Sequence, residues 1–170
     1  MNYSFYKKLY EPQAAFFKKR TWARNALKIG NYLFTGLPAA AYFTLLTAHV
    51  INKAFYALIP SVCIPLACFL FVTLFRAFIR RKRPYDKRGA AIEPVFYKDD
   101  KPNSFPSRHV ASAAVIATAY AYYCFPIGVA LYFITAGLAY ARFASGFHYP
   151  TDLLCGGVIG AIFGGLFFLI

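Results

Sequence analysis

The sequence predicts an all-α protein, a polytopic transmembrane helix bundle of about five crossings with an additional interfacial helix at its N-terminus. Of the 170 residues, 59% are apolar, a larger share than in most soluble domains. Residues 29–51 and 54–75 carry no formal charge, and each stretch is long enough to cross a hydrocarbon core of about 30 Å. Residues 109–141 also lack Lys, Arg, Asp and Glu. A chain of this length is expected to form one domain, 1–170.

Residues 1–25 are predicted to form the interfacial segment. Aromatic side chains mix there with cations, a composition that suits a helix lying at the level of the lipid headgroups. We expect an interruption near Pro12, because proline disfavours a helix interior. A loosely ordered tail is the alternative. The segment does not resemble a signal peptide, since it has no short apolar core with a cleavage site.

The expected crossings, in chain order, are 28–50, 54–79, 107–124, 126–144 and 150–170. A polar segment at 80–106 separates the second crossing from the third. The uncharged stretch that follows this segment is too long for one helix. We divide it at Pro126, because proline ends one helix and is tolerated in the first turn of the next.

The last crossing carries Gly156, Gly160 and Gly164. Small residues at every fourth position let helix backbones approach closely in lipid. We therefore interpret these glycines as a packing surface and not as a ligand site.

The formal net charge of +13 is distributed in a way that favours lipid over nucleic acid. With five alternating crossings, every Lys and Arg except Lys53 lies on one face of the membrane. Basic residues that flank membrane helices attract anionic headgroups, so the predicted partner is the lipid bilayer and not a nucleic acid. The four cysteines fit no zinc-binding spacing. No metal site and no cofactor are predicted.

Three short motifs share that basic face. They are Arg76-x6-Arg83-Pro84, Pro106-Ser107-Arg108-His109 and Arg142-x5-His148-x3-Asp152. Arginine and histidine are costly near a bilayer and usually face a functional interior. The motifs therefore predict one anion-binding pocket at the membrane surface.

The third motif pairs a histidine with a carboxylate. Asp152 follows Pro150 in the first turn of the last crossing, where the helix dipole favours a negative charge. From there it can reach back to His148. A carboxylate that binds one ring nitrogen fixes the tautomer and leaves the other nitrogen free to attack. A structural pair that caps the helix is the alternative.

The second motif begins a helix. Ser107 stands at the N-cap position of the third crossing, and the open N–H groups of a helix N-terminus bind phosphate. His109, two residues further on, is suited to protonate a leaving oxygen as a general acid. The alternative is a capped helix with an interfacial histidine.

The first motif supplies two arginines on one helix face. Arg76 and Arg83 are seven residues apart, which is two helical turns. A guanidinium suits bidentate contacts with phosphate. The alternative is that the run Arg80–Arg83 forms a solvated basic collar.

Together, the motifs closely resemble the type 2 phosphatidic acid phosphatase (lipid phosphate phosphatase) superfamily, which shares its site with vanadium haloperoxidases. The family pattern reads Lys-x6-Arg-Pro, Pro-Ser-Gly-His and Ser-Arg-x5-His-x3-Asp, and the resemblance spans residues 76–152. Three positions depart from it: Arg76 replaces the lysine, Arg108 the glycine and Ala141 the serine. The family core usually has six helices, against five crossings and an interfacial segment here.

The resemblance implies a role for each residue of the motifs. His148 would be the nucleophile that forms a phosphohistidine, Asp152 would orient it, and His109 would be the general acid. The implied phosphate-binding side chains are Arg76, Arg83, Ser107 and Arg142. Arg108 is expected either to add a phosphate contact or to point into solvent. The arginines neutralise the charge that develops on the phosphoryl group, so the mechanism requires no metal.

The predicted function is metal-independent hydrolysis of a phosphomonoester or diphosphate on a membrane lipid, of the phosphatidate, phosphatidylglycerol phosphate or polyprenyl diphosphate type. A non-catalytic binder or carrier of lipid headgroups is the alternative. A transporter is disfavoured, because no charged residue lies in the middle of a span.

The protein is expected to be a multi-pass protein of the plasma membrane. The positive-inside rule places the basic face in the cytoplasm. The family resemblance implies instead that the site lies on the outer or lumenal face.

Overall fold

The computed structural model describes residues 3–86, 89–96 and 103–170. Its elements are α1 (Tyr3–Lys19), α2 (Thr21–Ile51), α3 (Phe55–Ile79), α4 (Arg108–Tyr123), α5 (Phe125–Ala144), α6 (Pro150–Gly165) and the 3-10 turn η1 (Leu166–Leu169). The described residues contain no β-strand, so the predicted all-α class is confirmed. The parts of the predicted interfacial and polar segments that fall on 1–2, 87–88 and 97–102 lie outside the described residues.

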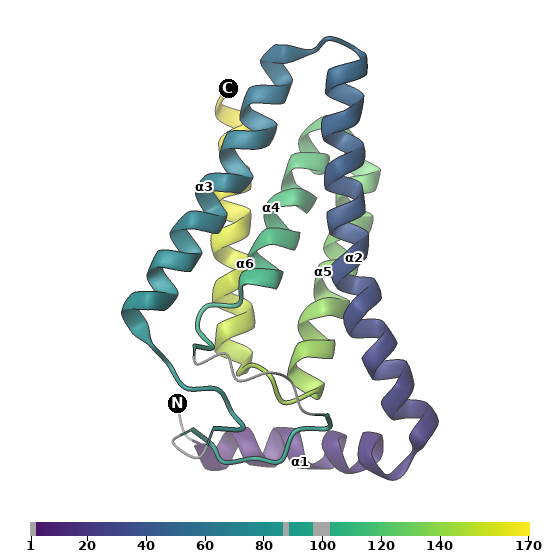
Figure 1. Cartoon of the computed structure of the whole chain (residues 1–170), viewed down its shortest axis with the longest axis vertical. Helices are drawn as coiled ribbons and strands as arrows, with labels where there is room; N and C mark the ends of the chain where they lie inside the picture. The colour runs from purple at the N-terminus through teal and green to yellow at the C-terminus, as the bar shows by residue number, and fades with distance from the viewer. Residues whose placement is uncertain (1–2, 87–88, 97–102) are drawn as a thin grey trace.

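Helices α2 to α6 run along the long axis of a bundle, and α1 lies across one end (Figure 1). Within the described chain, four segments are long and apolar enough to cross a membrane: Thr21–Ile51, Phe55–Ile79, Phe125–Ala144 and Pro150–Leu169. The molecule is therefore an integral membrane protein with several spans.

Helix α4 corresponds to the expected crossing at 107–124, and it occupies the interior of the bundle. Its 16 residues extend about 24 Å, less than a hydrocarbon core of about 30 Å. Ten of them are buried, because α2, α3, α5 and α6 all pack against this helix. Its alanine-rich sequence permits that close approach. The N-terminus of α4 consequently begins inside the bundle (Figure 1).

Helix α1 lies where the interfacial segment was expected, but the predicted interruption near Pro12 is wrong. The helix continues through Pro12 and ends at Lys19. Proline removes one backbone hydrogen bond, and packing on both sides of it outweighs this loss. Tyr6 and Tyr10 before Pro12 and Ala14 after it are buried against the bundle.

The first crossing is also longer than expected. Helix α2 begins at Thr21, not at residue 28, and has 31 residues, which corresponds to about 46 Å. This length exceeds the hydrocarbon core. The early basic residues Arg24 and Lys28 therefore lie on turns that extend the helix beyond the apolar layer.

The predicted glycine surface of α6 is confirmed. A Cβ atom built on Gly156 would lie 2.6 Å from the carbonyl oxygen of Ser107, and one on Gly160 would lie 2.3 Å from that of Ala111. Side chains larger than hydrogen do not fit at these positions. The close approach positions the start of α4, and with it Ser107, against α6.

We expect Gly160→Ala to destabilise the protein by about 1–3 kcal/mol, the usual cost of overpacking a core. The new methyl group would meet the α4 backbone at Ala111, which cannot move without shifting the whole helix. Thermal unfolding in detergent micelles measures the effect. Gly165→Ala is the matched control, because nothing lies within 4 Å of its added Cβ. Equal melting temperatures for the two variants would contradict the close packing of α4 on α6.

Candidate active site

The three predicted motifs meet at the end of the bundle that α1 covers (Figure 1). Arg76 lies in the last turn of α3 and Arg142 in the last turn of α5. His148 lies in the turn between α5 and α6. The backbone N–H of Ser107 donates to the carbonyl oxygen of Asp152 at 2.9 Å, which joins the starts of α4 and α6. The buried side chains of the site are Arg76, Arg83, Ser107, Arg142, His148 and Asp152.

The His148–Asp152 pair forms as predicted, with a long contact. Nδ1 of His148 lies 3.5 Å from Oδ2 of Asp152, beyond the usual hydrogen-bond length. The same Oδ2 accepts the backbone N–H of Tyr149 at 2.9 Å. Asp152 therefore caps α6 and also faces the imidazole. Since Nδ1 faces the carboxylate, Nε2 is the ring nitrogen available for attack.

The imidazole of His148 is kept neutral. Its pKa is lowered to about 4: burial is the main cause, the Asp152 contact opposes it, and the nearby charge of Arg83 adds to the lowering. At pH 7 the ring is therefore unprotonated, the form that a nucleophile requires.

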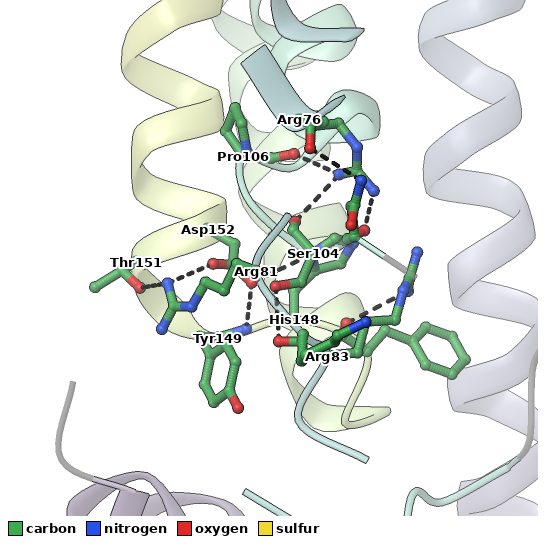
Figure 2. A network of polar contacts seen from close by, with 12 residues as sticks. Arg76, Arg81, Arg83, Ser104, Pro106, His148, Tyr149, Thr151 and Asp152 are labelled. Atoms are coloured by element: carbon green, nitrogen blue, oxygen red, sulfur yellow. Dashed lines mark hydrogen bonds and ion pairs between the residues drawn. The ribbon is translucent and has the colours of Figure 1, made fainter. Parts of the chain in front are cut away.

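Arg81 belongs to the site although the sequence did not single it out. Its guanidinium donates to Oδ1 of Asp152 at 2.7 Å and to the hydroxyl of Thr151 at 2.8 Å, as Figure 2 shows. It also lies 4.2 Å above the ring of Tyr149. Arg81 thus neutralises the buried carboxylate and fixes its orientation. Because it lies in a run of four basic residues, 80–83, the sequence does not indicate which of them pairs with Asp152.

Arg76 anchors the loop that precedes α4. Its Nη1 donates to the carbonyl oxygens of Ser104 at 3.1 Å and Pro106 at 2.5 Å, and its Nη2 donates to that of Asn103 (Figure 2). The Asn103 amide donates in return to the carbonyl oxygen of Arg76 at 2.9 Å. Three of the five N–H donors of the guanidinium are used in this way. Two remain for a phosphate.

Arg83 and Arg142 both lie near Phe147. Nη1 of Arg83 donates to the Phe147 carbonyl oxygen at 3.4 Å, and the Cζ of Arg142 lies 6.0 Å from the Phe147 ring centroid. Burial lowers the pKa of Arg83. The Nε of Arg142 is buried and has no hydrogen-bond partner in the structure. An unbonded buried donor is costly, so an anion bound here would stabilise the site.

Two polar side chains of α2, Asn31 and Thr35, hold Arg142 in place, and neither was among the predicted site residues. Nη2 of Arg142 donates to the hydroxyl of Thr35 at 3.0 Å, and that hydroxyl donates to the carbonyl oxygen of Asn31 at 2.7 Å. The Asn31 amide donates to the Ser145 hydroxyl at 2.9 Å. Polar side chains spaced by four residues inside an apolar helix are the signal that could have identified Asn31 and Thr35.

Ser107 is the N-cap residue of α4, as predicted, but its side chain makes no capping hydrogen bond. Its hydroxyl is fully buried and has no partner in the structure. The hydroxyl and the first N–H groups of α4 are therefore available to an anion.

Arg108 and His109 line a cavity of about 300 Å³ beside the site. Both side chains are partly exposed. Thr35, the partner of Arg142, lines the same cavity. The cavity therefore adjoins the site both through Thr35, next to Arg142, and through the first residues of α4.

Positive charge accumulates at this end of the bundle. The charges of Arg83 and Arg108 both repel that of Arg76, and Arg83 also repels Arg142. Asp152, the carboxylate of the motifs, is already paired with Arg81. Holding several buried cations together costs free energy, which a bound anion offsets. The arrangement can bind a group with the size and charge of phosphate next to a neutral imidazole.

Comparison with known proteins gave one family and two similar structures. The sequence model of the PAP2 superfamily matches residues 52–170. The crystal structure of Aquifex aeolicus LpxE has 22% sequence identity and a TM-score of 0.71, over 95% of this chain and 96% of that one. The crystal structure of a transmembrane PAP2-type phosphatidylglycerolphosphate phosphatase from Bacillus subtilis has 17% identity and a TM-score of 0.69, over 92% of this chain and 83% of that one. No curated protein sequence matched significantly.

Proposed function

Because the chain belongs to the PAP2 superfamily, we propose that it hydrolyses a phosphomonoester or a diphosphate on a membrane lipid, through a phosphohistidine and without a metal ion. The observation that carries this proposal is the convergence of buried guanidinium groups and an unbonded serine hydroxyl on the His148–Asp152 pair. The apolar spans keep the site next to its lipid substrate.

In the first step, Nε2 of His148 attacks the phosphorus atom. The N–P bond forms, and the P–O bond to the lipid breaks. His109 donates a proton to the departing oxygen, while Asp152 holds Nδ1–H of the nucleophile. The guanidinium groups of Arg83 and Arg142 stabilise the charge that develops on the phosphoryl oxygens.

In the second step, water attacks the phosphorus atom and the N–P bond breaks, which releases inorganic phosphate. His109, deprotonated by the first step, accepts a proton from this water. The hydroxyl of Ser107 and the first N–H groups of α4 donate to the phosphoryl oxygens in both steps. Arg76 keeps the preceding loop in place and offers its remaining donors to the phosphate.

We treat residues 1–170 as one functional unit. Side chains of α1 and of the described part of the 80–106 segment share a hydrophobic cluster with Tyr149, the neighbour of the nucleophile. The substrates to test are lipids with a terminal phosphate. The likeness to the phosphatidylglycerolphosphate phosphatase makes phosphatidylglycerol phosphate one of them. The other candidate substrates are phosphatidate, polyprenyl diphosphate and a phosphorylated lipid A.

Phosphate release from this panel tests the proposal. We expect the purified protein in detergent micelles to release inorganic phosphate from at least one of these lipids, at a rate that a chelator such as EDTA does not change. Lipid binding without any release of phosphate would establish a headgroup binder instead. Loss of activity on addition of EDTA would contradict the metal-free mechanism.

A further inference from the structure

The cavity beside the site is suited to bind a hydrocarbon chain of a lipid. It lies between α2, α3, α4 and α5, and its volume is about 300 Å³. Its apolar walls include Pro38, Phe69, Ile116 and Leu138. Helices α2 and α3 diverge towards the α1 end of the bundle (Figure 1). An apolar cavity among membrane helices accommodates hydrocarbon at little cost.

This cavity lies on the leaving-group side of the proposed reaction. His109, the general acid, lines it, whereas His148, the nucleophile, does not. Attack and departure occur on opposite sides of the phosphorus atom. A phosphate held at His148 would therefore direct the rest of the lipid past His109 into the cavity.

Arg108 is close both to the cavity and to two of the phosphate-binding residues. It lines the cavity, and its charge is close enough to Arg76 and Arg83 to repel both. Its Cζ lies 5.8 Å from the centroid of the Phe69 ring, one of the cavity walls. Arg76, Arg81, Arg83 and Arg142 each donate at least one hydrogen bond to the protein.

The guanidinium of Arg108, unlike those of the other four arginines, is not held by hydrogen bonds to described parts of the protein. In the described part of the chain it makes no hydrogen bond or ion pair, and its contact is the ring of Phe69. All five of its donors are open to a ligand. A partly buried cation in the lining of a largely apolar cavity would bind an anionic group that lies close to a hydrocarbon chain.

We propose that Arg108 determines substrate specificity by binding a second phosphate group, located between the scissile phosphate and the hydrocarbon chain. The inference rests on the proposed function. It narrows the substrate class to lipids that carry two phosphates in series, either a diphosphate or a terminal monoester joined to a phosphodiester. In both cases the bond that breaks is the ester or anhydride bond to the terminal phosphorus atom, and the inner phosphate stays on the lipid.

Two matched pairs of lipids test the inference. Polyprenyl diphosphate is compared with polyprenyl monophosphate, and phosphatidylglycerol phosphate with phosphatidate of the same acyl chains. We expect the wild-type protein to prefer the lipid with two phosphates in at least one pair. We expect Arg108→Gly to lower kcat/KM for that lipid by about 10- to 100-fold, as for the loss of a charged hydrogen bond. The value for its single-phosphate partner should change less than about 3-fold, since the terminal phosphate keeps its own contacts.

Three further variants separate specificity from folding. Arg108→Lys keeps the charge and should retain part of the preference, whereas Arg108→Gln keeps most of the length and should lose it. Arg24→Ala removes a cation from the start of α2 outside the site and should leave the ratio unchanged. Thermal unfolding of each variant in micelles confirms that it is folded.

The two ways of failing are distinguishable. If the wild type releases phosphate but the ratio within each pair is the same in Arg108→Gly and Arg108→Gln, the inference is wrong and the proposed function stands. An equal loss of activity on both members of a pair would instead assign Arg108 to the scissile phosphate, which also overturns it. If the wild type releases phosphate from no lipid, the proposed function fails, and the inference fails with it.

Discussion

His148→Ala is expected to reduce phosphate release by at least about 10⁴-fold, because it removes the atom that forms the covalent intermediate. The neighbouring arginines and Ser107 would still bind the lipid phosphate, so KM should change little. Phosphate release from the preferred lipid, measured at saturating substrate, gives the effect on kcat. Radiolabelled substrate quenched at alkaline pH should label the wild-type protein and leave the variant unlabelled.

His49→Ala is the matched control for this experiment. His49 is also a buried histidine, but it lies in the last turn of α2, at the opposite end of the bundle from the site. Its substitution should leave kcat within a few-fold of the wild-type value. If His148→Ala kept full activity, or if the label still appeared in it, His148 would not be the nucleophile and the mechanism would have to be abandoned.

The contacts of the site that could be predicted from the sequence are those between residues close together in the chain, where spacing determines geometry. Asp152 is the fourth residue after His148, and a proline between them marks the start of a helix, so the pairing follows from local structure. The position of Ser107 at an N-cap follows in the same way. Uncharged stretches likewise predicted the helices and their order.

Contacts between distant segments were less predictable. The partner of Asp152 is Arg81, 71 residues earlier in the chain, and four basic residues in a row gave no reason to choose it. The loop anchored by Arg76 is a similar case, since its backbone carbonyls carry no signature in the sequence. The continuation of α1 through Pro12 also depends on tertiary packing, which outweighs local propensity.

Arg76 stands where the family pattern has a lysine, and the loop that precedes α4 gives a physical explanation for this replacement. The planar guanidinium reaches three carbonyl oxygens at once, those of Asn103, Ser104 and Pro106. An ammonium also has three donors, but it is a compact point charge without the fork geometry of arginine. Arg76 therefore combines the positive charge of the family pattern with a structural role in positioning Ser107.

Asp152→Asn is the second substitution for which we expect a large effect, a fall in kcat of about 10³- to 10⁴-fold, as when a carboxylate that orients a catalytic histidine becomes an amide. The asparagine oxygen can still accept the N–H of Tyr149, so α6 stays capped. The variant loses the negative charge that faces Nδ1 of His148 and pairs with Arg81. KM should change little, because Asp152 does not contact the substrate phosphate in the proposed mechanism.

The pH dependence shows whether this loss comes from orientation or from protonation. Burial is the larger influence on the pKa of His148 and the Asp152 contact opposes it, so that the pKa is about 4 with the carboxylate in place. Removal of the carboxylate would lower this pKa further, so His148 stays neutral at pH 7 in both proteins. Protonation therefore cannot explain the loss, and raising the pH from 6 to 9 should not restore kcat. Recovery at high pH would show that Asp152 acts by tuning the proton affinity of His148, and the orienting role assigned to it would be wrong.

Arg81→Gln should give a smaller fall in kcat, of about 10-fold, because it leaves the carboxylate of Asp152 in place and removes only the group that positions it.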